Sequence, residues 1–478
     1  MKSTLLTRAV RLATLAAIAA PASVFAGGFS LNEQSASAMG VANAGAVANP
    51  ENATTVFFNP AGMSQLKGTN ISFGAAVLDI DAKAKNGARA NNQLPSVLPQ
   101  SEVQGTTGGD IADPAVLPNI YLTHEINDSI DVGFGIHAPY GLAADYDDEF
   151  VGRFFADKTE LTALSFTPAI SLNNGQGLSM GMGLNVMYVE GKLTKFMDNS
   201  GTLGSAQQNS IPVAPGTPAQ GYADIEGDDV AVTFQVGFLY ELNSQTQIGL
   251  KAQTGTELEL KGDAKFTNVA ALDPNLGAVG ALNSTEPARV PLAIPESISA
   301  GIRHRLTDEF TVLAGATYSR WSRFESLDIY GRDSSKPLTS QSPGGEPGSG
   351  QLTHIPEEWK NTWQLNVGGI WQATPEWALK AGYAWDESPV DQYVTARIPS
   401  SDRHWLTLGA QWKPAQSGWT VDAAVGTLLF TDDPKVLDKS YVLTSGGTAA
   451  STRDPNSFYE GEYDLEAWSA AIQVSKAF

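Results

Sequence analysis

The 478-residue chain contains no cysteine, few charged residues and no long apolar run. Without cysteine there can be no disulfide scaffold, no thiolate nucleophile and no cysteine-ligated zinc. Charged residues make up 17% of the chain, against about 25% in an average soluble protein. After the N-terminal segment, no window offers the roughly 18 apolar residues that a membrane-spanning helix needs. The formal charge of −21 argues against nucleic acid as a partner, because phosphate binding requires a concentrated basic surface.

The N-terminus has the features of a secretory signal. Lys2, Arg8 and Arg11 precede an apolar segment at 12–20, and small residues at Val24 and Ala26 suit a cleavage site. This apolar segment is too short to span a bilayer as a helix, which needs roughly 20 residues. We therefore predict that residues 1–26 are removed as a signal peptide; the alternative is an amphipathic anchor helix.

The rest of the chain alternates apolar and polar residues with a period of two, which is typical of β-strands. From Val230 to Leu242, the even positions hold large apolar side chains and the odd positions hold mostly small or polar ones. The segments 178–188 and 468–478 follow the same pattern. A soluble β-sandwich would give the same alternation, so the connections between strands must decide.

The connections alternate between short turns and long loops. Fourteen strands are predicted, starting near residues 69, 118, 129, 160, 178, 228, 245, 292, 308, 359, 376, 402, 417 and 464. The long loops are expected near 81–117, 142–159, 197–227, 262–291, 326–358, 387–401 and 431–463. An even strand number with turns at one end and loops at the other indicates an all-β transmembrane antiparallel barrel. Such a barrel leaves no strand edge unpaired in lipid.

Aromatic residues agree with this interpretation. Trp363 and Trp371, and likewise Trp377 and Trp385, share one strand face at a spacing of about 20 Å, near the height of the apolar band. The alternative for these tryptophans is core packing. The terminal Phe478 suits a signal to the outer-membrane assembly machinery. We predict a multi-pass protein in the outer membrane of a Gram-negative bacterium, surrounded by its lipid.

Several short motifs carry a resemblance to a known family. They are Gly-Phe-Ser-Leu-Asn-Glu-Gln at 28–34, Asn-Pro-Ala-Gly-Met at 59–63, Pro-Asn at 118–119, Tyr-Gly-Leu at 140–142, Asp-Glu-Ser-Pro-Val at 386–390, and Ile-Pro at 398–399 followed by Asp-Arg-His-Trp-Leu at 402–406. In these residues the chain resembles the FadL family of outer-membrane long-chain fatty-acid transporters. The resemblance spans Gly27 to Phe478 and is weakest in the long loops.

The resemblance implies a monomeric, fourteen-stranded barrel whose lumen holds an N-terminal hatch. The predicted domains are the signal peptide 1–26, the hatch 27–68 and the barrel 69–478 with long extracellular loops. The hatch motif is Asn59, Pro60 and Ala61. The family's third strand has an inward kink that opens the wall, which here falls on Pro139, Tyr140 and Gly141; the alternative is that the strand simply ends at the rim.

The same comparison and the strand parity predict a substrate-binding set. Odd positions of the strand near 178–196 face inward, and several are apolar before the strand reaches a lysine. An apolar tunnel ending in a cation suits an amphipathic carboxylate. By similarity, Lys195 and Lys360 match a family arginine and lysine that bind the fatty-acid carboxylate; the alternative is that either lysine pairs a lumen carboxylate such as Glu241. The predicted substrate-binding residues are Lys195, Lys360, Phe29, Met187, Val189 and Leu193.

A capture site is predicted in the secreted loop Phe266 to Leu282, because this loop is unusually apolar. By resemblance it forms the first, low-affinity site. Its apolar residues are Val269, Leu272, Leu276, Val279 and Leu282.

Enzyme activity is not predicted. No Gly-x-Ser-x-Gly motif occurs, and the five histidines are scattered; the alternative is an outer-membrane phospholipase. No cofactor or metal is expected, although the acidic loop 145–149 could bind calcium instead of being merely solvated. The expected function is passive, hatch-gated transport of long-chain fatty acids with lateral exit. Aromatic-hydrocarbon uptake, export of oxidised fatty acids and a surface adhesin or structural barrel remain as alternatives.

Overall fold

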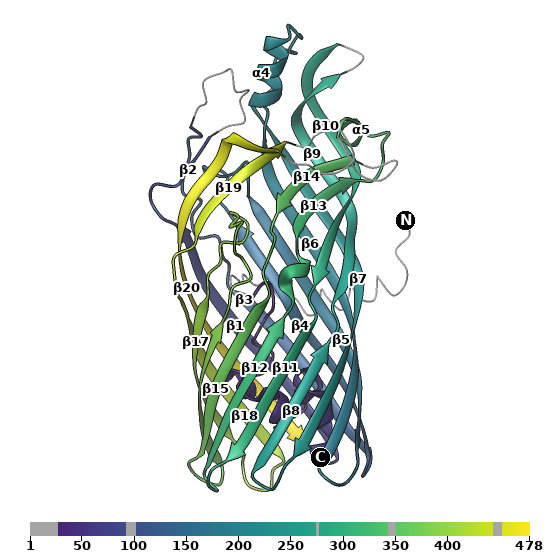
Figure 1. The fold of residues 1–478 in the computed structure, drawn as a ribbon, viewed down its shortest axis with the longest axis vertical. Helices are drawn as coiled ribbons and strands as arrows, with labels where there is room; N and C mark the ends of the chain where they lie inside the picture. The colour runs from purple at the N-terminus through teal and green to yellow at the C-terminus, as the bar shows by residue number, and fades with distance from the viewer. Residues whose placement is uncertain (1–26, 92–101, 274–276, 343–349, 443–451) are drawn as a thin grey trace.

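The computed structural model describes residues 27–91, 102–273, 277–342, 350–442 and 452–478. Its strands form a closed antiparallel barrel of fourteen, which confirms the predicted fold class (Figure 1). The first and last strands close the barrel, pairing from Asn70 with Ala477 to Ala84 with Tyr463.

Five of the barrel strands consist of two segments each where an interruption divides them. In chain order the barrel strands are β1 (Thr69–Ala84), β3 (Ala115–Asn127), β4 (Ile130–Asp145), β5 (Lys158–Asn173), β6 (Leu178–Asp198), β7 (Gln220–Glu241), β8 with β9 (Thr246–Gln253, Thr256–Asp273), β10 with β11 (Ala278–Ile294, Ser297–Arg305), β12 with β13 (Phe310–Ser319, Ser326–Gly331), β14 with β15 (Gly350–Pro356, Thr362–Gln372), β16 (Trp377–Asp386), β17 (Arg403–Trp412), β18 with β19 (Trp419–Phe430, Lys435–Val442) and β20 (Thr452–Ala477). A short strand, β2 (Arg89–Ala90), pairs with β20 and is not counted among the fourteen barrel strands.

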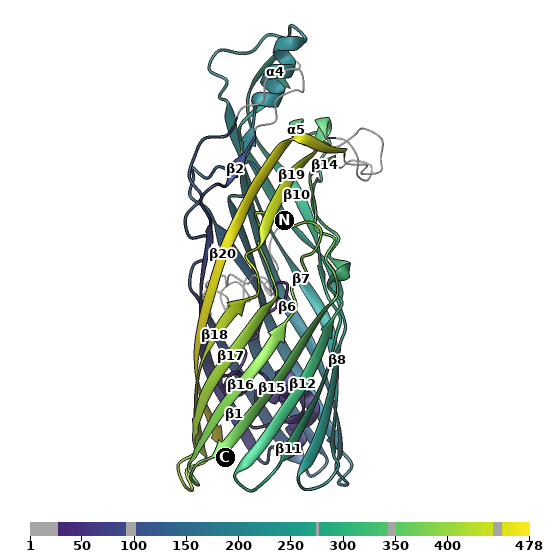
Figure 2. The ribbon, with the colours of Figure 1, turned by 60° about the vertical axis from the view of Figure 1, so that its left-hand side comes forward.

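The predicted strand starts agree best at the end with the short turns. The largest errors fall at the other end, where β7, β10, β14 and β20 begin earlier than predicted. There the strands extend beyond the lipid, so their outward side chains need not be apolar and the alternation fades. Figure 2 shows these extensions rising above the barrel wall together with α4 (Ser200–Gln208) and α5 (Pro337–Gln341).

The outward faces of the strands carry the apolar side chains, as the parity predicted. On β6, Met180 and Met182 are exposed at 45% and 59%, whereas Met187 and Val189 point inward and are buried. The tryptophans Trp363, Trp371 and Trp377 lie on the outer surface. Their exposure favours the aromatic belt over core packing.

The hatch lies inside the lower half of the lumen (Figure 1). It consists of short helical turns rather than strands, because its many Ala, Gly, Asn and Ser residues lack the alternation of a strand. Its elements are α2 (Ala36–Met39), η1 (Ala46–Ala48), α3 (Thr55–Phe58) and η2 (Pro60–Gln65). No helix of the described part of the chain is long and apolar enough to cross a membrane.

Candidate functional site

The Asn59-Pro60-Ala61 motif fixes the hatch to the barrel wall. Asn59 Nδ2 donates to the carbonyl of Phe238 on β7 at 3.0 Å and to that of Val47 within the hatch at 2.6 Å. Its Oδ1 caps η2 by accepting from the Ala61 amide at 3.1 Å. A Cβ added to Gly237 would lie 1.9 Å from Asn59 Oδ1, so glycine in the wall permits this close approach. The motif therefore acts as a rigid anchor at the base of the lumen.

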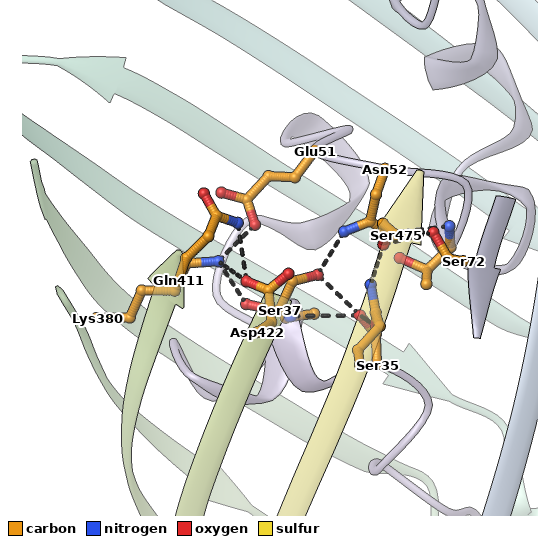
Figure 3. Close-up of polar contacts among 12 residues, drawn as sticks. Ser35, Ser37, Glu51, Asn52, Ser72, Lys380, Gln411, Asp422 and Ser475 are labelled. Atoms are coloured by element: carbon orange, nitrogen blue, oxygen red, sulfur yellow. Dashed lines mark hydrogen bonds and ion pairs between the residues drawn. The ribbon is translucent and has the colours of Figure 1, made fainter. Parts of the chain in front are cut away.

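A second anchor is a buried charge cluster on the opposite wall. Lys380 Nζ on β16 contacts Glu51 of the hatch at 2.6 Å and Asp422 of β18 at 3.4 Å, and it donates to the carbonyl of Ser37 at 3.0 Å (Figure 3). Gln411 donates to the same Asp422 oxygen at 2.8 Å. Because a buried charge is costly unless paired, loss of one charged member of this cluster would leave the others unpaired and weaken the hold on the hatch.

The wall is open beside β4. Among the described residues, the pairing of β3 with β4 ends at Ile120 with Ile136, although β4 continues to Asp145. The β4–β5 register shifts between His137 and Tyr140, at Ala138 and Pro139. The kink segment therefore lies within a continuing strand and not at the rim.

The start of the hatch occupies the edge of β4 that β3 leaves free. Leu31 donates its amide to the Pro139 carbonyl at 3.0 Å, and Gly141 donates to the Phe29 carbonyl at 2.9 Å. Ser30 and Tyr140 form an antiparallel bridge between them. The hatch thus supplies backbone partners that a break in a membrane wall would otherwise lack.

Phe29 is the centre of an aromatic cluster across the lumen. Its ring lies 4.6 Å from that of Trp321, 5.8 Å from Trp359, 5.9 Å from Tyr140 and 6.0 Å from Phe324, measured between centroids. Gly28 has a φ of +67°, and a Cβ there would lie 2.5 Å from the Trp321 ring, so glycine is needed to bring Phe29 into place. This aromatic partition separates two cavities.

The upper pocket lies above the aromatic partition, and the surface that it exposes is almost entirely apolar. Its apolar lining includes Phe29, Leu142, Leu161, Leu193, Ile225, Leu260, Leu292 and Phe324. Thr159, Glu160 and Lys192 also border it, and Arg397 and Ile398 reach it from the segment between β16 and β17. A pocket with this lining suits an acyl chain.

Arg397 is the buried cation of the upper pocket. Its guanidinium donates to Thr159 Oγ1 at 2.9 Å and to the carbonyls of Lys158 and Thr194 at 3.2 and 2.9 Å. All these acceptors are neutral, and Nε has no hydrogen-bond partner. In the part of the chain that the structure describes, no carboxylate lies within 4.0 Å of the guanidinium. The carboxylates of Asp438, Asp157 and Glu357 act on this charge without contacting it, so the guanidinium can still bind an anionic head group directly.

The predicted substrate-binding residues do not form one site: some lie at the upper pocket and others lie elsewhere. Phe29 and Leu193 line the upper pocket, Val189 belongs to the apolar cluster around it, and Met187 lines the cavity below the aromatic partition. Lys195 is half-buried, and its charged neighbours are Arg397 and Asp438. Asp438 itself accepts from the Ala396 amide at 3.3 Å.

Lys360 lies outside both cavities. It precedes β15, and its Nζ contacts Glu387 Oε1 at 3.0 Å. The carboxylate that pairs this lysine is therefore Glu387 and not Glu241, whose Oε1 accepts instead from Gln65 of the hatch at 2.7 Å. The assignment of Lys195 and Lys360 to a ligand carboxylate remains a prediction.

The prediction that the capture segment, residues 266–282, forms a loop is wrong. Its residues up to Asp273 belong to β9 and those from Ala278 belong to β10. The two strands form a hairpin, in which Val269 pairs with Leu282 and Leu272 with Val279. The outward faces of β9 and β10 carry polar residues here, so the alternation of apolar and polar positions did not reveal the strands. Val269 and Val279 are buried, and α4 and the segment after it cover Val279, whereas Leu272 is 43% exposed. Leu276 lies outside the described residues.

Other predicted features take ordinary positions. Phe478 is 73% exposed at the end of β20, and its amide donates to Thr69 at 2.9 Å. In the acidic segment, Asp145 contacts Lys158 at 3.0 Å. Within the described residues, no group of three or more His, Asp or Glu side chains is placed to hold a metal ion.

The sequence analysis missed Arg397 and the aromatic residues of the aromatic partition. Trp321, Phe324 and Trp359 lie where β12–β13 and β14–β15 are interrupted, so strand parity does not apply to them. Arg397 lies in a predicted extracellular loop that instead folds into the lumen. Its position next to the Ile398-Pro399 motif was the only available signal.

A closed outer-membrane barrel with an internal hatch and an apolar pocket defines a transport protein for hydrophobic compounds. A sequence profile of the family described as "Outer membrane protein transport protein (OMPP1/FadL/TodX)" matches residues 16–478. The chain belongs to this family, and it is an outer-membrane protein of a transporter family.

Individual relatives are distant. The "47 kDa outer membrane protein" of Pasteurella multocida is 29% identical over 417 residues, 86% of this chain and 89% of that protein. The "Long-chain fatty acid transport protein" of Escherichia coli is 25% identical over 470 residues, 94% of this chain and 97% of that protein.

Two solved structures are similar in fold. A Pseudomonas aeruginosa FadL homologue has a TM-score of 0.76 at 22% identity, covering 94% of this chain and all of that one. The Pseudomonas putida toluene transporter TodX has a TM-score of 0.64 at 16% identity, covering 94% and 99%. These likenesses show the fold and leave the choice of substrate open.

Proposed function

We propose that this protein carries long-chain fatty acids across the outer membrane by passive diffusion, with release sideways through the wall at β4. The observation that supports the substrate class is the unpaired guanidinium of Arg397 at an apolar pocket. Burial of each CH₂ of an acyl chain contributes about 0.8 kcal/mol. A charge-assisted hydrogen bond to the carboxylate adds about 1.5–3 kcal/mol.

The gate in this proposal is the start of the hatch. Phe29 closes the floor of the upper pocket, and its backbone covers the free edge of β4. Movement of this one segment would open the floor and expose the edge together. Both anchors, at Asn59 and at Lys380, would keep the rest of the hatch in place meanwhile.

Uptake of an aromatic hydrocarbon is the second candidate, because the apolar pocket would also accept it and a toluene transporter shares the fold. A neutral hydrocarbon has no use for Arg397, which favours the fatty acid. Export in the opposite direction and a purely structural role are tested by the same measurement.

The test compares uptake of labelled oleate and labelled toluene by cells that lack other such transporters. A Pro139→Val/Gly141→Val variant straightens the segment beside the opening, and surface abundance and oleate binding in detergent serve as controls. We expect oleate uptake by the wild type, and loss of uptake with retained binding in the variant. Uptake of toluene alone would support the second candidate, and wild-type uptake by the variant would exclude lateral release. Uptake of neither compound would exclude import.

A further inference from the structure

The cavity below the aromatic partition differs in chemistry from the upper pocket. This lower chamber lies between the hatch and the wall. Its lining includes the neutral polar side chains of Ser165, Asn185, Gln253, Ser299, Thr317 and Gln364. A hydrocarbon can form no hydrogen bond with these groups, whereas a polar head group can. The lower chamber suits a polar group.

Lys251 supplies a cation to this chamber. Its Nζ donates to the Phe57 carbonyl of the hatch at 2.7 Å and lies 4.7 Å from the centroid of the Phe57 ring. An ammonium group has three donors, and among the described residues the Phe57 carbonyl is the one protein acceptor that Lys251 reaches. Within the described ranges, no carboxylate oxygen lies within 4.0 Å of Lys251 Nζ, the limit for an ion pair. Its charge is therefore available to a ligand.

His137 lines the same chamber as Lys251. It is 2% exposed, and its Nδ1 has no hydrogen-bond partner. Its ring stacks on Tyr121 at 5.6 Å, and Phe57 meets it edge-on at 4.9 Å, so its orientation is fixed. His137 is also the residue at which the β4–β5 register begins to shift. The unpaired nitrogen thus lies beside the opening in the wall.

We propose that Lys251 and His137 form a second binding site, for the carboxylate of an amphipathic ligand, at the inner mouth of the wall opening. This inference rests on the proposed function, in which the ligand leaves by that opening. A carboxylate that leaves Arg397 must cross the lumen, and an unpaired anion in a low-dielectric site is costly. A second cation below the aromatic partition lowers this cost. Two sites of moderate strength favour passage over retention.

The test replaces Lys251 with glutamine, which removes the charge but can still donate to the Phe57 carbonyl. Lys251→Arg keeps the charge, and Lys413→Gln, in an exposed turn, is the matched control. The probes are labelled oleate and labelled oleyl alcohol, which has the same chain and no charge. Uptake into cells is measured with both, and oleate affinity is measured in detergent.

For Lys251→Gln we expect about a tenfold loss of oleate uptake, unchanged oleyl alcohol uptake, and oleate affinity within about twofold of wild type. Lys251→Arg should restore oleate uptake, and Lys413→Gln should match wild type. Wild-type oleate uptake by Lys251→Gln would overturn the second site. An equal loss of both probes would also overturn it, because it would indicate that Lys251 only holds the hatch. Failure of the wild type itself to take up oleate would overturn the proposed function, and this inference with it.

Discussion

The Phe29 carbonyl accepts a hydrogen bond of 2.9 Å from the amide of Gly141, so the first residues of the hatch replace β3 as the partner of β4. The same Phe29 carries the ring at the centre of the aromatic partition. One short segment therefore closes both the floor of the upper pocket and the opening in the wall.

Replacing Arg397 should weaken fatty-acid binding. Arg397→Gln removes a charge that no carboxylate contacts directly, and loss of a charge-assisted contact of about 1.5–3 kcal/mol corresponds to a ten- to hundredfold weaker affinity. Fluorescence competition with oleate measures it. Arg153→Gln is the control, since Arg153 also donates to backbone carbonyls, of Gln104 and Phe150, but lies away from the pocket. Equal affinities for both variants would contradict the head-group assignment.

The two predicted lysines should differ in their effects. Lys195→Ala removes a charge next to Arg397 and should weaken oleate binding about tenfold, the effect of about 1.4 kcal/mol. Lys360→Ala removes a lysine already paired with Glu387, so a smaller change is expected. The same competition assay compares them. A larger loss for Lys360→Ala would place the carboxylate near β15 instead.

Binding of an anion should strengthen below neutral pH. Asp438 belongs to β19, at the extracellular end of the barrel, and burial raises its pKa to about 6 against the opposing charges of Arg397 and Lys195. Below that pH the carboxyl is neutral and no longer attracts these cations, so more positive charge is available to the ligand.

The probe for this effect is dodecyl sulfonate, whose head group stays ionised. We expect about fivefold tighter binding at pH 5 than at pH 7.5, which corresponds to about 1 kcal/mol of binding free energy. Asp438→Asn should bind tightly at both values. A pH effect that survives in Asp438→Asn would assign it to another group.

Removing Lys380 should loosen the hatch. Lys380→Met leaves Glu51 and Asp422 buried without a counter-charge, at a cost of about 3–5 kcal/mol. Influx of an antibiotic too large for the closed barrel measures the leak, and Lys413→Met is the control. The triple variant with Glu51→Gln and Asp422→Asn removes the unpaired charges and should recover much of the seal. A tight barrel in Lys380→Met would contradict the role of this charge cluster as an anchor of the hatch.

The sequence was sufficient for the barrel because lipid imposes a simple rule on each strand. Outward positions such as Met180, Met182 and Trp363 must be apolar, and the turn and loop lengths then gave the strand number. Where the strands extend beyond the lipid, this requirement no longer applies. The parts of β9 and β10 between residues 262 and 291 were therefore predicted as a loop.

The candidate site was harder to predict because its contacts join distant parts of the chain outside the regular strands. The pairing of Phe29 with Gly141 and the contact of Arg397 with Thr194 have no local pattern. Family resemblance located the kink at Pro139 but not the hatch segment that covers it. Parity identified the inward face of β6, yet the buried cation Arg397 comes from a segment without parity.

The most direct test of the account is a reversible lock between the hatch and β4. Ser30 and Tyr140 are an antiparallel pair flanked by the two backbone hydrogen bonds, and such pairs lie at a Cα separation of about 4.5 Å, within disulfide range. Because the chain has no cysteine, a Ser30→Cys/Tyr140→Cys variant can form only this bond.

Labelled-oleate uptake is measured for this variant before and after reduction, so the reduced protein is its own control. The account predicts background uptake in the oxidised protein and restored uptake after reduction, with oleate binding present in both states. Equal uptake in the oxidised and reduced states would contradict it, because the ligand would then pass without moving Phe29.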